Sequence, residues 1–454
     1  MEHYKLIIIG AGLSGLSAGL RHARTGESTL IVEQHSIAGG LNSYYTRKGL
    51  LLETGLHAIT NYATKAQRSA PLTRLLRQLK IKHHEFEIYP HKFSEIAFPD
   101  TKLKFSNDFE LFISEIAKQF PKQIDNFKNL VTAINDFDAF TPSKYISART
   151  ILSTYITDPL LIEMLLCPIQ FYGGYQENDL DWAQFTIMFE ALFKEGFFRC
   201  SGGIKWLLER LLSGYANQGG EIKFKSKVAK ILKNKNKVLG IRLENGTEIT
   251  CDAIISTAGT PNTLEFLEEN NQDEIIATSG RLAYVESLFI YDYNTKFSTE
   301  AAITFFNNSN HFNYASPKTL VDYNSGVICF PGNFKNYTPE RGQLRITHLA
   351  NYTNWKVLDK QSYKTQKDTL AKQSLKAIPI PPPSHKAFFQ DSFTPTTVER
   401  YTGKKNGSIY GSPIKNRLGL TNYDNCFIAG TDQGYLGIVG AMLSGLTIVN
   451  QQLL

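Results

Sequence analysis

Three glycines near the start of the chain have a spacing suited to holding a phosphate group. They belong to the stretch Gly10-Ala11-Gly12-Leu13-Ser14-Gly15, which follows an apolar run over residues 5–9 and opens a helical pattern over residues 14–25. Glycine permits a tight turn and close approach of a diphosphate, and free N–H groups at a helix start favour its negative charge. We expect Gly10, Gly12, Leu13, Ser14 and Gly15 to contact a diphosphate. The alternative is a glycine-rich turn without a ligand.

An acidic residue completes this pattern at the end of the next strand. Residues 29–33 have the pattern of a buried strand that ends in Glu33, so strand, helix and strand form a βαβ unit of about 30 residues. A carboxylate at this place can accept hydrogen bonds from ribose hydroxyls. The turn and Glu33 together predict a bound dinucleotide.

A second glycine pair, Gly39-Gly40, follows Glu33 closely. Such a pair is not part of a simple NAD site, so the sequence favours FAD. Glu33 followed by Gly39-Gly40 resembles the FAD signature of the superfamily of amine oxidases, phytoene desaturases and Rab GDI. The resemblance implies that Gly40 and Leu41 lie at the cofactor. Many relatives place arginine where this chain has Leu41, which leaves one expected contact without its residue.

Two later stretches resemble further parts of the same superfamily. The resemblance of a glycine pair, Gly202-Gly203, and of the strands after it implies that the backbone of Val228 contacts adenine. Near the end of the chain, Asp432 precedes a glycine-rich helix start, where a carboxylate can bind ribityl hydroxyls and a positive helix end can stabilise reduced flavin. The alternative is that Asp432 caps the last helix. The residues expected at this end of the cofactor are Gly430, Asp432, Gly437, Ile438 and Val439.

Within the superfamily, two segments look most like the branch that contains carotenoid isomerase and retinol saturase. They are residues 53–57, which end in His57, and residues 394–411, which contain Arg400. His57 is a candidate to donate a proton or polarise the flavin, or else a structural histidine; Arg400 is a candidate for flavin O4, or else pairs with a carboxylate. No cysteine precedes the terminal segment where relatives link flavin covalently, so we expect noncovalent FAD.

This resemblance implies an FAD-dependent oxidoreductase that desaturates, saturates or isomerises a hydrophobic polyene or isoprenoid. Flavin transfers hydride at N5, so no acid–base pair is required. A long apolar pocket is expected, for which the aromatic candidates, each equally explained by ordinary packing, are Phe185, Phe189, Phe193, Phe197, Phe198 and Tyr172. The alternatives are a flavin amine oxidase and a lipid-binding escort similar to Rab GDI. An electron partner such as NAD(P)H would bind transiently, since no second nucleotide motif is visible.

The elements that must position these residues indicate an α/β protein. We predict a doubly wound, Rossmann-type FAD-binding domain built from three chain segments, residues 1–70, 201–262 and 391–454. Amphipathic patterns separated by prolines predict an inserted helical cap over residues 71–200. Alternating stretches at residues 283–291 and 344–350 predict a mixed-sheet substrate domain over residues 263–390.

Composition restricts the class of protein further. The chain has 454 residues, a formal charge of +7, 29 Phe and 22 Tyr, and no dense basic block that would suggest nucleic acid. Five single cysteines, with no paired spacing, favour a reducing compartment and predict neither disulfides nor a metal site. No apolar run approaches the about 20 residues of a membrane span, so we expect a cytoplasmic protein.

One amphipathic pattern suggests contact with a membrane surface. Leu72, Leu75, Leu76 and Leu79 share one helix face, with basic residues elsewhere on the helix. Such a helix can rest on an anionic bilayer and deliver a lipid-soluble substrate. An ordinary surface helix of the cap is the alternative.

Overall fold

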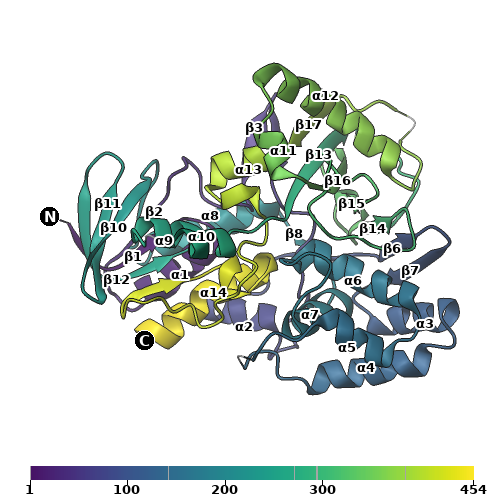
Figure 1. Ribbon diagram of the computed structural model, residues 1–454, viewed down its shortest axis with the longest axis horizontal. Helices are drawn as coiled ribbons and strands as arrows, with labels where there is room; N and C mark the ends of the chain where they lie inside the picture. The colour runs from purple at the N-terminus through teal and green to yellow at the C-terminus, as the bar shows by residue number, and fades with distance from the viewer. Residues whose placement is uncertain (1, 142, 270, 293–294, 384) are drawn as a thin grey trace.

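In the computed structural model, the chain visits one seven-stranded sheet three times (Figure 1). The structure describes residues 2–141, 143–269, 271–292, 295–383 and 385–454. The first visit adds two strands, the second four and the third one. In sheet order, these strands are β10 (Val228–Asn234), β11 (Lys237–Leu243), β12 (Glu248–Ser256), β1 (His3–Ile9), β2 (Thr29–Val32) and β9 (Glu221–Lys223), with β18 (Cys426–Ile428) also paired to β12.

The middle of this sheet is parallel and buried on both faces, as the continuously apolar strands predict. The helices of this nucleotide unit are α1 (Leu13–Ala23), α2 (Pro71–Leu79), α8 (Gly203–Ala216), α9 (Thr260–Phe266), α10 (Gln272–Thr278) and α14 (Gly437–Ile448). Side chains of a strand alternate between faces. Leu6 and Ile8 lie on the face of the sheet that is covered by helices α1, α8 and α14. Ile7 and Ile9 lie on the opposite face, with residues of the β10–β11 hairpin.

A second seven-stranded sheet forms the upper right of Figure 1. Its strands are, in sheet order, β17 (Phe389–Phe393), β13 (Ala283–Tyr291), β16 (Gly342–Ala350), β15 (Ser325–Cys329), β14 (Ile303–Asn307), β6 (Ser94–Phe98) and β7 (Thr101–Phe105). Helices α11 (Tyr352–Lys356), α12 (Lys360–Ala377) and α13 (Pro395–Thr402) lie beside it. The sheet is mixed, because β14 pairs with β6 in parallel and its other neighbours are antiparallel.

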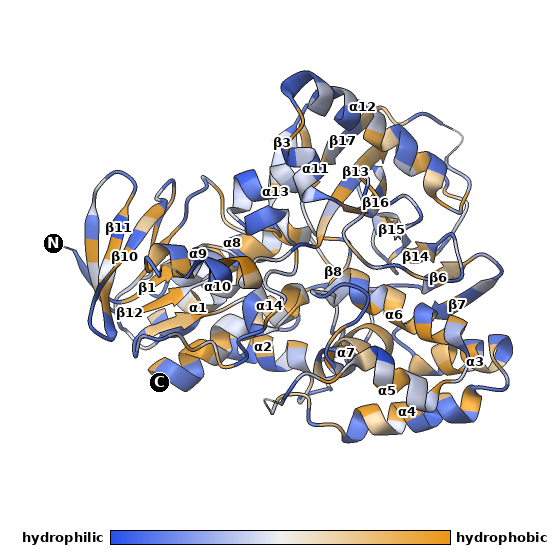
Figure 2. Cartoon of the chain, viewed as in Figure 1, coloured by the Kyte–Doolittle hydropathy of each residue, from blue (hydrophilic) through white to orange (hydrophobic). Residues whose placement is uncertain are grey.

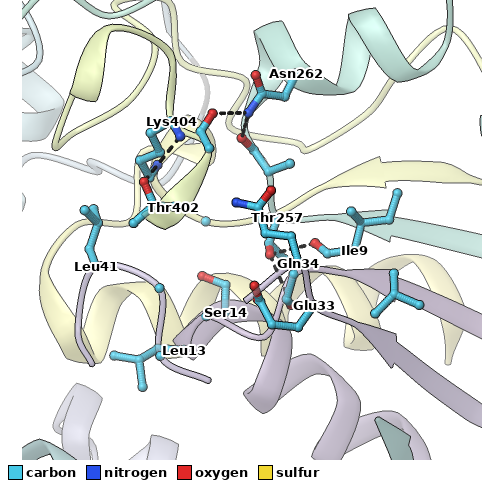
Figure 3. A pocket seen from close by; sticks show the side chains of 18 of the residues that line it. Ile9, Leu13, Ser14, Glu33, Gln34, Leu41, Thr257, Asn262, Thr402 and Lys404 are labelled. Carbon is cyan, nitrogen blue, oxygen red and sulfur yellow. Dashed lines mark hydrogen bonds between the residues drawn. The ribbon is translucent and has the colours of Figure 1, made fainter. Parts of the chain in front are cut away.

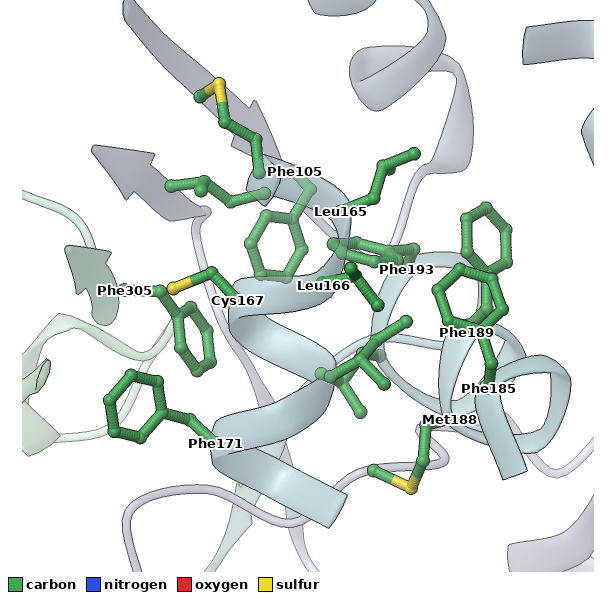
Figure 4. Close-up of a cluster of buried hydrophobic side chains, with 14 of the residues drawn as sticks. Phe105, Leu165, Leu166, Cys167, Phe171, Phe185, Met188, Phe189, Phe193 and Phe305 are labelled. Atoms are coloured by element: carbon green, nitrogen blue, oxygen red, sulfur yellow. The ribbon is translucent and has the colours of Figure 1, made fainter. Parts of the chain in front are cut away.

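A layer of helices lies below this sheet in Figure 1. They are α3 (Phe109–Gln119), α4 (Ile124–Asp136), α5 (Ala148–Tyr155), α6 (Pro159–Gly173) and α7 (Trp182–Phe189), which continues as a π turn. Orange and blue residues alternate along α3, α4 and α5 in Figure 2, as expected for helices with one buried face. Their apolar faces meet an aromatic core around Phe105, Phe112 and Phe193 (Figure 4).

Two short ribbons connect these layers. One pairs β3 (Tyr44–Arg47) with β4 (Leu50–Glu53), and the other pairs β5 (Ile88–Pro90) with β8 (Phe198–Cys200). Segments far apart in the sequence, before and after the helical layer, are thereby joined near the centre of the molecule.

The structure divides residues 71–200 differently from the expected helical cap. Helix α2 packs against α1 and α14 of the nucleotide unit, and β6 and β7 extend the second sheet. Leu72, Leu75, Leu76 and Leu79 are all buried, none more than 3% exposed. The hypothesis that this face of α2 rests on a bilayer is therefore wrong, because the nucleotide unit covers it.

Across the residues that the structure describes, every helix is too short or too polar to cross a membrane.

Candidate functional site

A groove opens where strands of the first sheet end, with the glycine-rich turn on one side and a later loop on the other (Figure 3). Parallel strands commonly place nucleotide sites at their carboxyl ends. The lining residues come from all three visits of the chain to the sheet; they are Ile9, Gly10, Gly12, Leu13, Ser14, Val32, Glu33, Gln34, Gly39, Gly40, Leu41, Asn42, Ser226, Lys227, Val228, Thr257, Ala258, Asn262, Phe266, Thr402, Gly403, Lys404, Gly430, Thr431 and Ala441.

The glycine turn leaves open space for a ligand at one glycine and is closely packed at another. A methyl group on Gly12 would meet no protein atom within 4 Å, so this glycine faces the groove. A methyl group on Gly15 would lie 2.0 Å from the carbonyl oxygen of Gly10, so only glycine lets α1 pack on the turn. Gly10 itself has a φ of +102°, a conformation that glycine adopts without strain.

The second glycine pair packs directly on this turn. The N–H of Gly39 donates to the carbonyl of Ala11 at 2.8 Å, and a methyl group on Gly40 would lie 3.5 Å from Cα of Gly12. Gly40 and Leu41 line the groove beside Gly12. The structure therefore brings together the two glycine groups that the sequence predicts to hold the diphosphate.

Glu33 lies in the wall of the groove (Figure 3), and Val228 is also one of the lining residues. Its carboxylate oxygens accept from the N–H groups of Ala11 at 2.8 Å and of His35 at 2.7 Å. These two bonds fix the side chain at the groove wall, and a carboxylate has acceptor capacity beyond them for ribose hydroxyls.

The opposite wall contains residues that no sequence pattern marked. Asn262 Nδ2 donates to the carbonyl of Gly403 at 2.9 Å, which holds the loop of Thr402, Gly403 and Lys404 over the groove. The Lys404 ammonium donates to Thr431 Oγ1 at 2.9 Å. The fold of this loop brings Lys404 to the groove, but Lys404 belongs to no motif of fixed spacing. The sequence therefore gives no signal that Lys404 lies at the site.

Asp432 lies behind the groove wall rather than in the lining. It is 1% exposed, and its oxygens accept from the N–H groups of Ser412 at 2.9 Å and Thr260 at 2.6 Å. Burial favours the neutral form, but Lys415 and Lys404 outweigh it and hold the pKa of Asp432 below its ordinary value. In this structure Asp432 anchors two backbone segments, one at Ser412 and one at the start of α9, which was not among the expected roles.

Gly430 and Ala441 of α14 line the groove, whereas Gly437, Ile438 and Val439, which the sequence places at the flavin, are not among its lining residues. A methyl group on Gly430 would lie 3.4 Å from Ser14 Oγ, which places the terminal segment against the start of α1. Gly437, Ile438 and Val439 form the first turn of α14, whose N–H groups have no partner within the helix. A methyl group on Gly437 would lie 3.3 Å from Thr60 Oγ1, so Thr60, at the end of the segment 53–60, lies against this helix start.

His57 belongs to a buried group of charges next to that segment. Its Nε2 lies 2.9 Å from Glu286 Oε2 on β13, and the guanidinium of Arg345 on β16 binds the other oxygen of Glu286. Burial raises the pKa of Glu286, but Arg345 and the contact with His57 outweigh this effect and hold it down, at about 2. These contacts position His57 and are consistent with the structural role that the sequence left open.

The same group ties the backbone of residues 53–57 to both sheets. Arg345 donates to the carbonyl of Leu56 at 2.8 Å, and Arg199 donates to the carbonyl of His57 at 2.9 Å and binds the Glu53 carboxylate. Glu53 also accepts from the N–H of Ile204 at 2.8 Å, in the first turn of α8. The segment is therefore fixed from the nucleotide unit and from the second sheet at once.

Arg400 is not brought to this site. It is exposed on α13, and its guanidinium lies 5.5 Å from the ring centroid of Tyr401. It is also absent from the groove lining. The structure therefore supports neither the flavin contact nor the carboxylate pair expected for Arg400.

A family model described as flavin containing amine oxidoreductase matches residues 13–451 of this chain. The chain belongs to this family. This flavin-containing oxidoreductase is 22% identical to the chloroplastic prolycopene isomerase of Arabidopsis thaliana, with 92% of the chain and 76% of the isomerase covered. It is also 22% identical to the all-trans-retinol 13,14-reductase of Danio rerio, with 98% of the chain and 85% of the reductase covered.

Solved structures agree with the architecture. An oxidoreductase from Methanosarcina mazei superposes with a TM-score of 0.69 at 15% identity, with 98% of this chain and all of that chain covered. The predicted superfamily, fold class and flavin cofactor are confirmed by these comparisons.

The residues of the groove fit FAD. Gly12 offers open backbone for a diphosphate, Glu33 lies where a ribose is expected, and Lys404 lines the opposite wall. A diphosphate beside the ammonium of Lys404 would balance its positive charge. Bound FAD supplies hydride transfer at its N5 atom.

Proposed function

We propose that this flavin-containing oxidoreductase binds FAD noncovalently and acts on C=C bonds of a hydrophobic polyene or isoprenoid. The observation that carries the proposal is the similarity, over more than nine-tenths of the chain, to proteins named prolycopene isomerase and all-trans-retinol 13,14-reductase. Prolycopene and retinol, which these two names contain, are both hydrophobic polyenes, and this is the substrate class that we propose.

The aromatic interior around Tyr172 favours an apolar substrate. Tyr172 packs its ring 5.2 Å from the rings of both Phe197 and Phe305. Its hydroxyl is buried and lacks a hydrogen-bond partner among the residues that the structure describes. Burial raises the pKa of Tyr172 far above its usual value, so the hydroxyl stays protonated and available as a donor.

In the proposed site, the protein residues bind and orient rather than activate the substrate. Arg199 and Arg345 fix the backbone of residues 53–57. The aromatic core around Phe105, Phe112 and Phe193, called the aromatic layer from here on, is expected to exclude water. A polyene has no ionisable group for the protein to titrate, so shape and exclusion of water are the expected contributions. An electron partner such as NAD(P)H would bind transiently, and we propose a membrane surface as the source of the substrate, through a face other than that of α2.

The test is to purify the protein, release bound flavin by heat and extract bound lipid with organic solvent. The protein is then incubated anaerobically with a poly-cis carotenoid and with all-trans-retinol, once with oxidised flavin and once after reduction by dithionite, which supplies the two electrons that saturation consumes. Chromatography measures isomerisation or saturation. The proposal predicts released FAD and conversion of a polyene. Hydrogen peroxide formed with amines, without any polyene conversion, would favour an amine oxidase; a protein that carries lipid but no flavin would favour an escort similar to Rab GDI.

A further inference from the structure

We infer that Lys404 provides the positive charge that pairs with the diphosphate of FAD, a charge that Leu41 on the facing wall does not supply. The inference rests on the proposed function in one respect, which is that FAD is the ligand of the groove. It adds the residue that makes the groove selective for a diphosphate.

The position of the Lys404 ammonium carries the first step. Lys404 lines the groove, and its ammonium is bonded to Thr431 Oγ1 at 2.9 Å. Thr431 follows Gly430, which lies against Ser14 at the start of α1. Figure 3 shows the loop of Lys404 across the groove from Ser14 and Leu13. A diphosphate held at the start of α1 therefore lies between the N–H groups of the helix and this ammonium.

The loop holds Lys404 in place, unlike a surface lysine on a free chain. The carbonyl of Gly403 is bonded to Asn262, and the N–H of Lys404 donates to Thr402 Oγ1 at 3.3 Å. Gly403 has a φ of +70°, which ends α13 and turns the chain over the groove. A cation that is already ordered loses little conformational entropy when its anion binds.

The charges around Lys404 leave a place for an anion. Lys415 donates to the carbonyls of Tyr410 at 2.6 Å and Thr431 at 3.0 Å and lies over the ring of Tyr175. Both oxygens of Asp432 are bonded to backbone N–H groups. For the Lys404 ammonium, Thr431 Oγ1 is the side-chain acceptor that the described residues provide. An ammonium has three donors, so its bonding is incomplete.

Burial adds to the imbalance. It lowers the pKa of Lys404, and the opposing effect of Asp432 does not restore the ordinary value. A diphosphate next to the ammonium would stabilise its charged form. The bonding and the charge thus both favour an anion on the groove side of Lys404.

The test compares the ligand affinity of Lys404→Met with that of the unchanged protein. The flavin-free protein is titrated with FAD and, separately, with ADP, which carries the diphosphate without the flavin. Methionine keeps the apolar stem and removes the charge. Loss of a charged hydrogen bond predicts a Kd about 10- to 100-fold higher for both ligands. Lys404→Arg is expected to restore most of the affinity.

Lys405→Met is the matched control. Lys405 is the adjacent residue, but its ammonium pairs with Glu265 at 2.6 Å on the protein surface. This variant is expected to bind FAD and ADP as the unchanged protein does. The thermal unfolding midpoint of each flavin-free variant separates lost binding from lost folding, and Lys404→Gln replaces Lys404→Met if the latter does not fold.

Each outcome decides between the claims. Unchanged affinity for ADP in the folded Lys404→Met or Lys404→Gln variant overturns the inference, and loss of FAD affinity alone assigns Lys404 to the flavin end instead. If the unchanged protein binds ADP but not FAD, the proposed function fails while the role of Lys404 at a diphosphate can still be measured. If it binds neither ligand, both claims fail.

Discussion

The nucleotide groove and the aromatic layer below the second sheet are built on opposite principles. In the groove, residues from three distant segments line a space for a ligand, and Gly12 presents its backbone to that space without a side chain. In the aromatic layer, ring packs on ring; Phe112 and Phe193 stack with centroids 4.5 Å apart, and Phe105 packs edge-on to Phe193 at 5.1 Å. The groove depends on positions that lack a side chain, such as Gly12, whereas the aromatic layer depends on rings that fill its volume.

This difference determines how each region responds to substitution. A groove glycine cannot be exchanged without blocking a backbone approach, whereas a core side chain can be exchanged for another of similar volume at modest cost. Binding in the groove therefore depends on the identity of individual residues, whereas packing in the aromatic layer depends on the total volume of its apolar side chains. The following variants test this contrast, from the largest expected effect to the smallest.

The first pair of variants separates the two uses of glycine within the turn. In Gly15→Ala the new methyl group would lie 2.0 Å from the Gly10 carbonyl, so the turn must shift; we expect a lower unfolding midpoint without ligand and no measurable FAD binding. In Gly12→Ala the methyl group meets no protein atom within 4 Å. We expect unchanged stability without ligand but FAD binding weakened at least about 100-fold. Equal stability losses in both variants would contradict this contrast.

The second variant, Glu286→Gln, removes one charge from the buried group that joins the sheets. Breaking a buried ion pair typically costs about 3–5 kcal/mol, and denaturant unfolding of the flavin-free protein measures it. Because the folded pKa of Glu286 is held at about 2, below its ordinary value of 4.5, its stabilisation is fully present above pH 4.5 and is lost as the pH falls toward 2. The variant should lack this part of the acid sensitivity. A pH profile identical to that of the unchanged protein would contradict the assignment.

The third variant addresses the aromatic layer. Phe193 is fully buried and stacks on Phe112, so Phe193→Leu keeps an apolar side chain of nearly the same volume. We expect a loss of about 1 kcal/mol in unfolding free energy and an FAD affinity within twofold of the unchanged protein. A large loss of FAD affinity would show that the layer, and not only the groove, determines binding.

The fourth variant, Arg400→Ala, should have the smallest effect. The side chain is exposed and contacts the ring of Tyr401, so we expect a stability change within about 0.5 kcal/mol and unchanged FAD affinity. Visible absorption of the bound flavin provides the sensitive measurement, since a shift in its bands would place Arg400 at the flavin.

The sequence predicted the parts of the site that depend on residue identity at fixed spacing. Gly10, Gly12, Gly40, Glu33 and Val228 all line the groove as expected, because strand ends, tight turns and positive φ angles leave few choices of residue. The mixed sheet was also predicted from alternation, and β13 and β16 pair over their full lengths.

The sequence did not predict features that depend on long-range packing. The face of α2 with Leu72 and Leu75 has the same spacing whether it meets a membrane or the nucleotide unit, so spacing alone could not decide. Strands β6 and β7 lie between stretches of helical pattern, and they join the second sheet because β6 pairs with β14. Lys404 and Glu286 reach their places through tertiary structure, which no local pattern encodes.

The measurement that tests the central claim most directly is the visible absorption spectrum of the freshly purified protein, with the flavin quantified after heat release. The account predicts an oxidised flavin spectrum, close to one FAD per chain, and release of the flavin by heat without proteolysis. A folded protein that is colourless and takes up no FAD from excess would contradict the assignment of the groove between the glycine turn and the Lys404 loop.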